Sequence, residues 1–389
     1  MKKYNSLFYY LASANLLFFL GNSSYILLPI FLKNLGASES YIGVMNNIDK
    51  VMVVISSVSI GYIIQGKDRI KFLRIGYITL MIAFSSYLLI SSLTPLILLI
   101  RILQGVGFSI AMILGYTIVF DIVSMENATE AIAIYGVTGA LCNALSPFFG
   151  ELLLTAGYSH SLIFFLTVIL VTLSLCITFI MPRAPVQTKT ITKIRSRGVF
   201  HLFADVKFSA VAIASTIFGG AFGVIITYLP NFVRSTTSYK FSYFFLIFTA
   251  VLILIRFTFF RIINRFNKYS LVIIVFFVGA AMNFLLNFLY SFVIFVIISI
   301  CYGITHGVLF PVLNTLTVSI VREHDKDKAN AMFMAFFYGG MVVFALTLGF
   351  LIDYFNTYLA AFNVCGVAFL AGGFMMLILN VKHGPAEIK

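Results

Sequence analysis

The chain is poor in charge and lacks tryptophan altogether. Only 10% of its 389 residues are charged and none is tryptophan, whereas 61% are hydrophobic. A soluble domain carries about a quarter charged residues, because water must wet its surface. The shortage of charge therefore excludes an ordinary soluble fold and indicates that most of the surface faces lipid.

Cysteine is also scarce, and so are the motifs of enzyme chemistry. The four cysteines are isolated in apolar segments, without disulfide or metal-ligand spacing, at Cys142, Cys176, Cys301 and Cys365. The sequence shows no metal-ligand cluster, nucleophile motif or phosphate-binding glycine loop. We therefore expect neither an enzyme acting on lipids nor a bound metal or cofactor.

What the chain has in abundance is long apolar blocks. A block of about 20 residues spans the roughly 30 Å of bilayer hydrocarbon as a helix. Helices are required because backbone polar groups in lipid must bond within the segment. Twelve blocks are found, at 8–32, 41–65, 73–93, 95–121, 130–156, 160–181, 208–233, 241–263, 270–291, 293–319, 329–355 and 358–381. The sequence thus predicts an all-α membrane protein with twelve transmembrane helices, whose first block is too long for a cleavable signal peptide.

The blocks form two similar sets. The segment Leu28-Pro-Ile-Phe-Leu-Lys33 is similar to Leu229-Pro-Asn-Phe-Val-Arg234, and Ala131-Ile-Ala133 is similar to Ala329-Asn-Ala331. Both pairs are separated by about 200 positions. Such a repeat predicts two pseudo-symmetric six-helix halves, 1–181 and 208–389, joined by a linker at 182–207.

Basic residues outnumber acidic residues by 26 to 13, giving a net charge of +13. They gather in alternate loops and in the linker, where Arg183, Lys189, Lys193, Arg195 and Arg197 fall. This asymmetry is typical of the positive-inside rule and argues against nucleic-acid binding. We expect a cell (inner) membrane protein with both termini cytoplasmic and a linker that rests on anionic lipid headgroups.

One segment within the fourth block carries a family resemblance. Arg101-Ile-Leu-Gln104-Gly105-Val-Gly107 resembles the R-x-x-q-G-x-g pattern of the major facilitator superfamily. Glycines at these positions let a neighbouring helix approach closely. The resemblance implies the major facilitator fold: a transporter of a small molecule that works by alternating access, with protons as the expected coupling ion. We expect a monomer, because one pair of halves can enclose its own site.

The loop after the second block resembles the same family's G-x-L-a-D-r-x-G-r motif. It reads Gly61-Tyr-Ile-Ile-Gln65-Gly-Lys-Asp68-Arg69, and its second-half counterpart contains Asn264 and Arg265. The resemblance implies a gating loop formed by these six residues. Gln65 and Asn264 stand where the family has a carboxylate, which predicts that the gate is held differently here.

Two further stretches bear on the branch of the family. Ser146-Pro147-Phe-Phe-Gly150-Glu151 keeps part of an antiporter motif, and Tyr302 to Asn314 resembles members that carry small organic or drug-like compounds. The resemblance favours the efflux branch over the sugar porters.

Charged residues within the spans are the strongest candidates for the site, because each costs about 2.5–3.5 kcal/mol at the bilayer centre. Asp49 and Lys50 lie about eight residues from the outer end of the second block, roughly 12 Å deep. Arg101 lies at a similar depth, so the three side chains are expected to meet. One hypothesis makes Asp49 the proton-coupling acid, with Lys50 or Arg101 as its partner. The alternative is a static ion pair that fixes helix packing.

Other polar residues in the spans leave two interpretations open. Glu151 is a second candidate acid or snorkels to water, and Arg256 binds an anionic substrate or snorkels. His306 lies near the middle of its helix, where it binds substrate, relays a proton or bonds to a neighbouring helix. The remaining candidates line a cavity or hold helices together: Gln104, Asn15, Asn22 and Asn143.

Two transport hypotheses follow. The first is proton-coupled export of small amphipathic or drug-like molecules, and the second is proton-linked uptake of a small organic nutrient or anion. Charge preference separates them, because export of cations requires an exposed acid and uptake of anions an exposed base. A purely structural scaffold would not require a duplicated six-helix plan.

Overall fold

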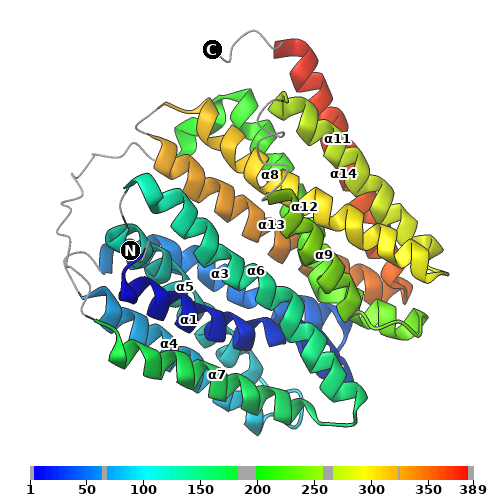
Figure 1. Ribbon diagram of the computed structural model, residues 1–389. Helices are drawn as coiled ribbons and strands as arrows, with labels where there is room; N and C mark the ends of the chain where they lie inside the picture. Colours follow the sequence, from blue (N-terminus) through cyan, green and yellow to red (C-terminus); the bar gives the residue numbers. More distant parts are fainter. Residues whose placement is uncertain are drawn as a thin grey trace. The chain divides into compact units, whose positions relative to one another are not determined.

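The computed structural model describes residues 4–63, 68–123, 125–182, 199–256, 266–322 and 325–383. Within these ranges every regular element is a helix (Figure 1). The described α-helices form twelve segments when the broken first segment is counted once. Ten of them are long and apolar enough to span a membrane. The remaining two predicted spans, 41–65 and 241–263, extend beyond the described residues. The predicted all-α membrane fold is confirmed.

The first half begins with an interrupted segment. Where the sequence predicted an unbroken helix over 8–32, a 3-10 turn separates α1 from α2, whose first turn contains Pro29. Proline removes a backbone donor, so a break just before it is expected. The elements are α1 (Ser6–Asn22), η1 (Ser23–Leu27), α2 (Leu28–Asn34), α3 (Glu39–Ile63), α4 (Arg69–Ser86), η2 (Tyr87–Leu89), α5 (Leu96–Ile122), α6 (Met125–Thr155) and α7 (His160–Ile180).

The second half repeats this order about 200 residues later, as the sequence repeat indicated. Its elements are η3 (Val199–Ala204), α8 (Val206–Thr236), α9 (Ser242–Leu254), α11 (Lys268–Leu285), η5 (Leu286–Phe288), α12 (Phe292–Ile320), α13 (Lys326–Phe355) and α14 (Tyr358–His383). Most of the predicted linker, 183–198, lies outside the described residues.

Two compact units are formed. One comprises Met1–Ala37 and Met45–Thr192, and the other Ser38–Val44 and Lys193–Lys389. In the first unit α4 packs on α5 and α7, and α1 packs on α6 and α7. In the second, α8 packs on α13, α11 on α14 and α9 on α12.

The glycines of the α5 motif explain two of these contacts. A Cβ at Gly105 would lie 2.6 Å from the backbone oxygen of Asp49 on α3, and one at Gly107 would lie 3.0 Å from that of Gly76 on α4. Side chains at these positions would force the helices apart. The predicted close approach is confirmed, with α3 on one side of α5 and α4 on the other.

Candidate functional site

Asp49, Lys50 and Arg101 meet in the first unit, as their predicted depths indicated. Oδ1 of Asp49 lies 2.6 Å from Nη2 of Arg101 and 3.0 Å from Nζ of Lys50. Lys50 also donates to Oδ2 of Asp49 at 3.2 Å and to the backbone oxygen of Asn46 at 2.8 Å. A single carboxylate is therefore shared by two cations.

Arg101 is held at every side of its guanidinium group. It donates from Nε to the backbone oxygen of Met45 at 2.6 Å and from Nη2 to that of Asn46 at 2.9 Å. Nη1 donates to Oε1 of Gln104 at 2.6 Å. The planar fork of arginine suits such multiple acceptors, and here it fastens α5 to two successive carbonyls of α3. Arg101 is thus a fixed anchor rather than a movable group.

Gln104 extends the connection to α1. Its amide donates to Oδ1 of Asn22 at 3.2 Å, and its oxygen accepts from the Tyr87 hydroxyl at 3.4 Å. We call Asn22, Asp49, Lys50, Arg101 and Gln104 the charge network. It joins three helices of the first unit through side chains that the sequence placed among the candidates.

The charge network has a buried end and an accessible end. The Arg101 side chain is 1% exposed, whereas those of Asp49 and Lys50 are each 18% exposed. The two ends of the network therefore differ in burial: Arg101 is enclosed, whereas Asp49 and Lys50 are partly exposed.

The other polar candidates of the first half bind helices together. Asn15 on α1 donates to Oγ1 of Thr138 on α6 at 2.7 Å, and Asn143 on α6 accepts from Ser23 at 2.8 Å. These bonds correspond to the interpretation of the asparagines as links between helices. Glu151 is buried near the end of α6. Its expected role in proton coupling remains a prediction.

Only part of the predicted gating loop is described. Asp68 caps α4 by accepting from the backbone amides of Ile70 and Lys71, and Arg69 forms an ion pair with Asp121 at the end of α5. Gly61 lies in α3. Three gating residues lie outside the described residues: Gln65, Asn264 and Arg265.

In the second unit His306 lies among phenylalanine rings from four helices. Its ring centre is 4.4 Å from that of Phe222 and 5.4 Å from that of Phe218, both on α8. Phe248 of α9, Phe310 of α12 and Phe337 of α13 complete the set. We call these six residues the aromatic cluster. Arg256, the other candidate in this half, follows α9 and is exposed.

Sequence reasoning named His306 but missed the rings around it. The only signal was the spacing of His306 and Phe310, which puts them on one face of a helix. The rings on α8, α9 and α13 depend on how those helices are rotated, which one sequence does not reveal.

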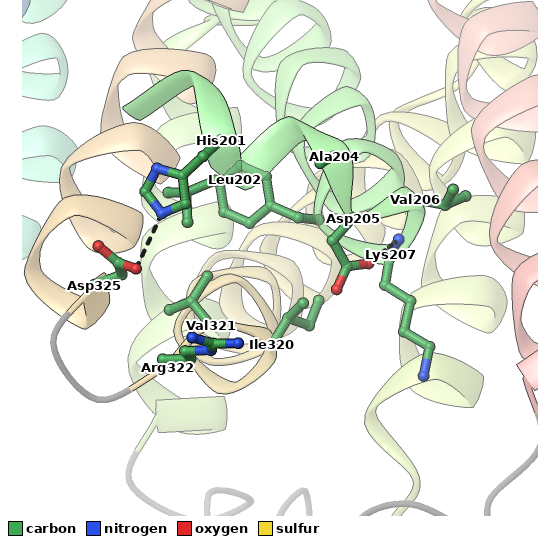
Figure 2. Close-up of a pocket in the computed structure, with 11 residues that line it drawn as sticks. His201, Leu202, Ala204, Asp205, Val206, Lys207, Ile320, Val321, Arg322 and Asp325 are labelled. Carbon is green, nitrogen blue, oxygen red and sulfur yellow. Dashed lines mark hydrogen bonds and ion pairs between the residues drawn. The ribbon is translucent and has the colours of Figure 1, made fainter. Parts of the chain in front are cut away.

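A cavity of about 680 Å³ was also missed (Figure 2). It lies where η3 and the start of α8 meet the end of α12, and Asp325 on its wall bonds His201 at 3.1 Å and Lys328 at 2.7 Å. Among the described residues, no group of three His, Cys, Asp or Glu side chains is placed to hold a metal ion.

An all-helical membrane protein built from two repeated halves, with ionised side chains inside its spans, has the construction of a secondary transporter. Comparison with family models agrees, because residues 11–323 and 241–389 match the model of the Major Facilitator Superfamily. The chain belongs to the Major Facilitator Superfamily and is a transporter, not an enzyme.

Solved structures of the same fold are similar over nearly the whole chain. The nucleoside transporter NupG is 15% identical with a TM-score of 0.82, covering 98% of this chain and 100% of that one. A D-xylose-proton symporter is 15% identical, with a TM-score of 0.75 and coverage of 95% and 96%. A peptide transporter in complex with sulfate is 13% identical, with a TM-score of 0.78 and coverage of 97% and 94%. No curated protein sequence matches the chain.

These identities show a common fold and leave the substrate open. The three structures are described as nucleoside, xylose and peptide transporters, so they give no support to the expected efflux branch.

Proposed function

We propose that the protein is a proton-coupled transporter that takes up a small organic solute, with Asp49 as the coupling acid. The observation that carries this proposal is the sharing of the Asp49 carboxylate between a fixed, buried Arg101 and a partly exposed Lys50. Placing a carboxylate inside a membrane costs free energy, so such a residue usually has a functional role.

The proposal gives different parts to the two cations. Arg101 cannot leave without abandoning two backbone carbonyls and Gln104, so it positions the acid. Lys50 has a flexible side chain, and its ammonium group donates to Asp49 and to one carbonyl of its own helix. When Asp49 takes up a proton its attraction for Lys50 falls, and Lys50 can turn toward water. The network thus has two arrangements, which a coupled transporter needs.

Uptake is favoured over export because one of the similar structures is a D-xylose-proton symporter. Export of amphipathic compounds remains the second candidate, supported by the resemblance of Tyr302 to Asn314 to drug-carrying members. The partial antiporter motif adds little, because only Pro147 and Gly150 of it are kept.

Accumulation of labelled solutes in cells tests the proposal. Uridine, D-xylose and a dipeptide would be offered with and without a protonophore, alongside extrusion of a fluorescent lipophilic cation. We expect one solute to accumulate in a protonophore-sensitive way. Asp49→Asn should lose this accumulation but should still exchange labelled solute across the membrane when no proton gradient is present. Asp205→Asn is the matched control, since Asp205 caps α8 and asparagine caps helices equally well.

The outcome separates the two directions. Gradient-driven accumulation of a solute supports uptake, while protonophore-sensitive extrusion of the cation with no accumulation supports export. Full accumulation by Asp49→Asn would remove Asp49 from the coupling role.

The proposal includes a monomer in the cell membrane with both termini in the cytoplasm, lipid and protons being its other partners. Reporter fusions after residue 383 and within 184–197 test this orientation. Both should report a cytoplasmic location, and a reporter found outside would reverse the assignment.

A further inference from the structure

The aromatic cluster surrounds a single polar side chain with apolar rings. Phe222 approaches the His306 imidazole to 4.4 Å between ring centres, and Phe310 stacks on it at 5.8 Å with only 9° between the planes. Phe248 meets it edge-on at 5.6 Å. Flat faces and edges are therefore offered around one imidazole, an arrangement suited to other aromatic rings.

The one polar side chain of the cluster has an unsatisfied atom. His306 is 9% exposed, and its Nδ1 is buried without a hydrogen-bond partner among the described residues. A buried polar group without a partner costs about 1–3 kcal/mol, so such an atom in a folded protein calls for an explanation. A bound ligand that hydrogen-bonds Nδ1 would supply one.

The cluster has an accessible edge. Phe222 and Phe310 are partly exposed, whereas Phe218, Phe248 and Phe337 are buried. The two partly exposed rings are also the ones that come nearest to the imidazole or stack on it. An entering solute would therefore meet Phe222 and Phe310 first, with His306 directly behind them.

We propose that the aromatic cluster binds the transported solute through a planar, uncharged heteroaromatic ring that hydrogen-bonds Nδ1 of His306. This inference rests on the proposed transport function and names the class of solute. The ring stacks on Phe222 and Phe310, and a ring N–H or carbonyl pairs with the imidazole. A solute without an aromatic ring gains none of the stacking.

Charge argues for the same class. Among the described residues, no carboxylate forms an ion pair or hydrogen bond with His306, and the other five members of the cluster are phenylalanines. An organic cation bound here would lack a negative partner and would lose its hydration without compensation. A neutral ring carries no such penalty.

The absence of tryptophan gives a direct test, because one introduced tryptophan becomes the only one in the protein. Phe222→Trp places it at the accessible edge. Phe277→Trp is the matched control, since Phe277 is also partly exposed and pairs with another ring, Phe374, away from the cluster. Purified full-length protein in nanodiscs would be titrated with uridine, with adenine and with D-xylose.

We expect saturable quenching of Phe222→Trp emission by a heteroaromatic probe, none by D-xylose, and none in Phe277→Trp. His306→Phe in the Phe222→Trp background keeps the ring and removes the nitrogen, so affinity should fall about tenfold. His306→Gln restores a hydrogen-bonding group and should recover part of the loss. A structural role for His306 would not produce that recovery.

Three results would overturn the inference: no saturable quenching in a folded Phe222→Trp protein, equal quenching in the control, or unchanged affinity in His306→Phe. Binding needs no gradient, so its failure is distinct from failure of the proposed function. Quenching without gradient-driven accumulation would support the ring-binding site and contradict proton coupling. Accumulation of D-xylose without quenching would support coupled transport and contradict the ring-binding site.

Discussion

The two halves of the molecule share one helix contact but surround it with different side chains. At Gly105 on α5 an added Cβ would lie 2.6 Å from the backbone oxygen of Asp49 and 2.6 Å from Cβ of Met52. At Gly303 on α12 it would lie 2.8 Å from the backbone oxygen of Phe248 and 2.7 Å from Cβ of Val251. The corresponding helices thus meet at corresponding glycines.

The side chains around these contacts differ in kind. Phe248 stands where the first half has Asp49, and Ser299, four residues before Gly303, stands where the first half has Arg101. Ser299 donates to a carbonyl of its own helix, so this position makes no charged bond between helices. The contact is made at the glycine backbone, so it accommodates different side chains beside it in the two halves. One half came to hold charge and the other a surface of rings.

The largest expected effect comes from placing the first half's acid in the second half. Phe248→Asp would bury a carboxylate among phenylalanines without a cation, which should cost at least about 3 kcal/mol. Thermal unfolding in detergent would show a much lower apparent Tm than Phe248→Leu, which changes shape but not charge. Equal Tm values for the two variants would mean that the aromatic cluster accommodates charge as the first half does.

Arg101→Lys tests whether the charge network needs an arginine fork rather than a positive charge. A lysine ammonium cannot reach the carbonyls of Met45 and Asn46 together with Gln104, and each acceptor left unsatisfied costs about 1–3 kcal/mol. We expect a loss of about 2–3 kcal/mol in unfolding free energy, with weaker transport. Wild-type stability would show that charge alone suffices there.

Gly105→Ala and Gly303→Ala sharpen the comparison by disturbing the shared contact. Each added methyl would overlap a neighbouring helix, and overpacking of this kind costs about 1–3 kcal/mol. The two variants should lose similar amounts of stability in parallel unfolding experiments. A loss confined to one half would mean that the contacts are not equivalent.

The smallest effect is expected at the ion pair between Arg69 and Asp121. These side chains are 24% and 13% exposed, so solvent screens their attraction. A double-mutant cycle with Arg69→Ala and Asp121→Ala should give a coupling of about 0.2–1 kcal/mol in unfolding free energy. A coupling several times larger would mark this loop as a principal link of the first half.

Much of the fold was predictable from apolar block length, because lipid leaves helices as the only backbone solution. The meeting of Asp49, Lys50 and Arg101 was predictable because the three lie at similar depths below the outer ends of their apolar blocks. The break before Pro29 was missed, because the apolar run continues through it. The aromatic cluster was missed because it depends on helix rotation, and 43 phenylalanines give no clue to which ones gather.

The most direct test of the account is whether Asp49, in the charged half, couples proton movement to solute entry. The protein would be reconstituted in liposomes containing a pH-sensitive dye, and the solute selected by the accumulation assay added outside. We expect wild type to acidify the interior as solute enters. Under the same solute gradient, Asp49→Asn should still exchange solute across the membrane, but the internal pH should not change. Acidification by Asp49→Asn at the wild-type rate would contradict the account.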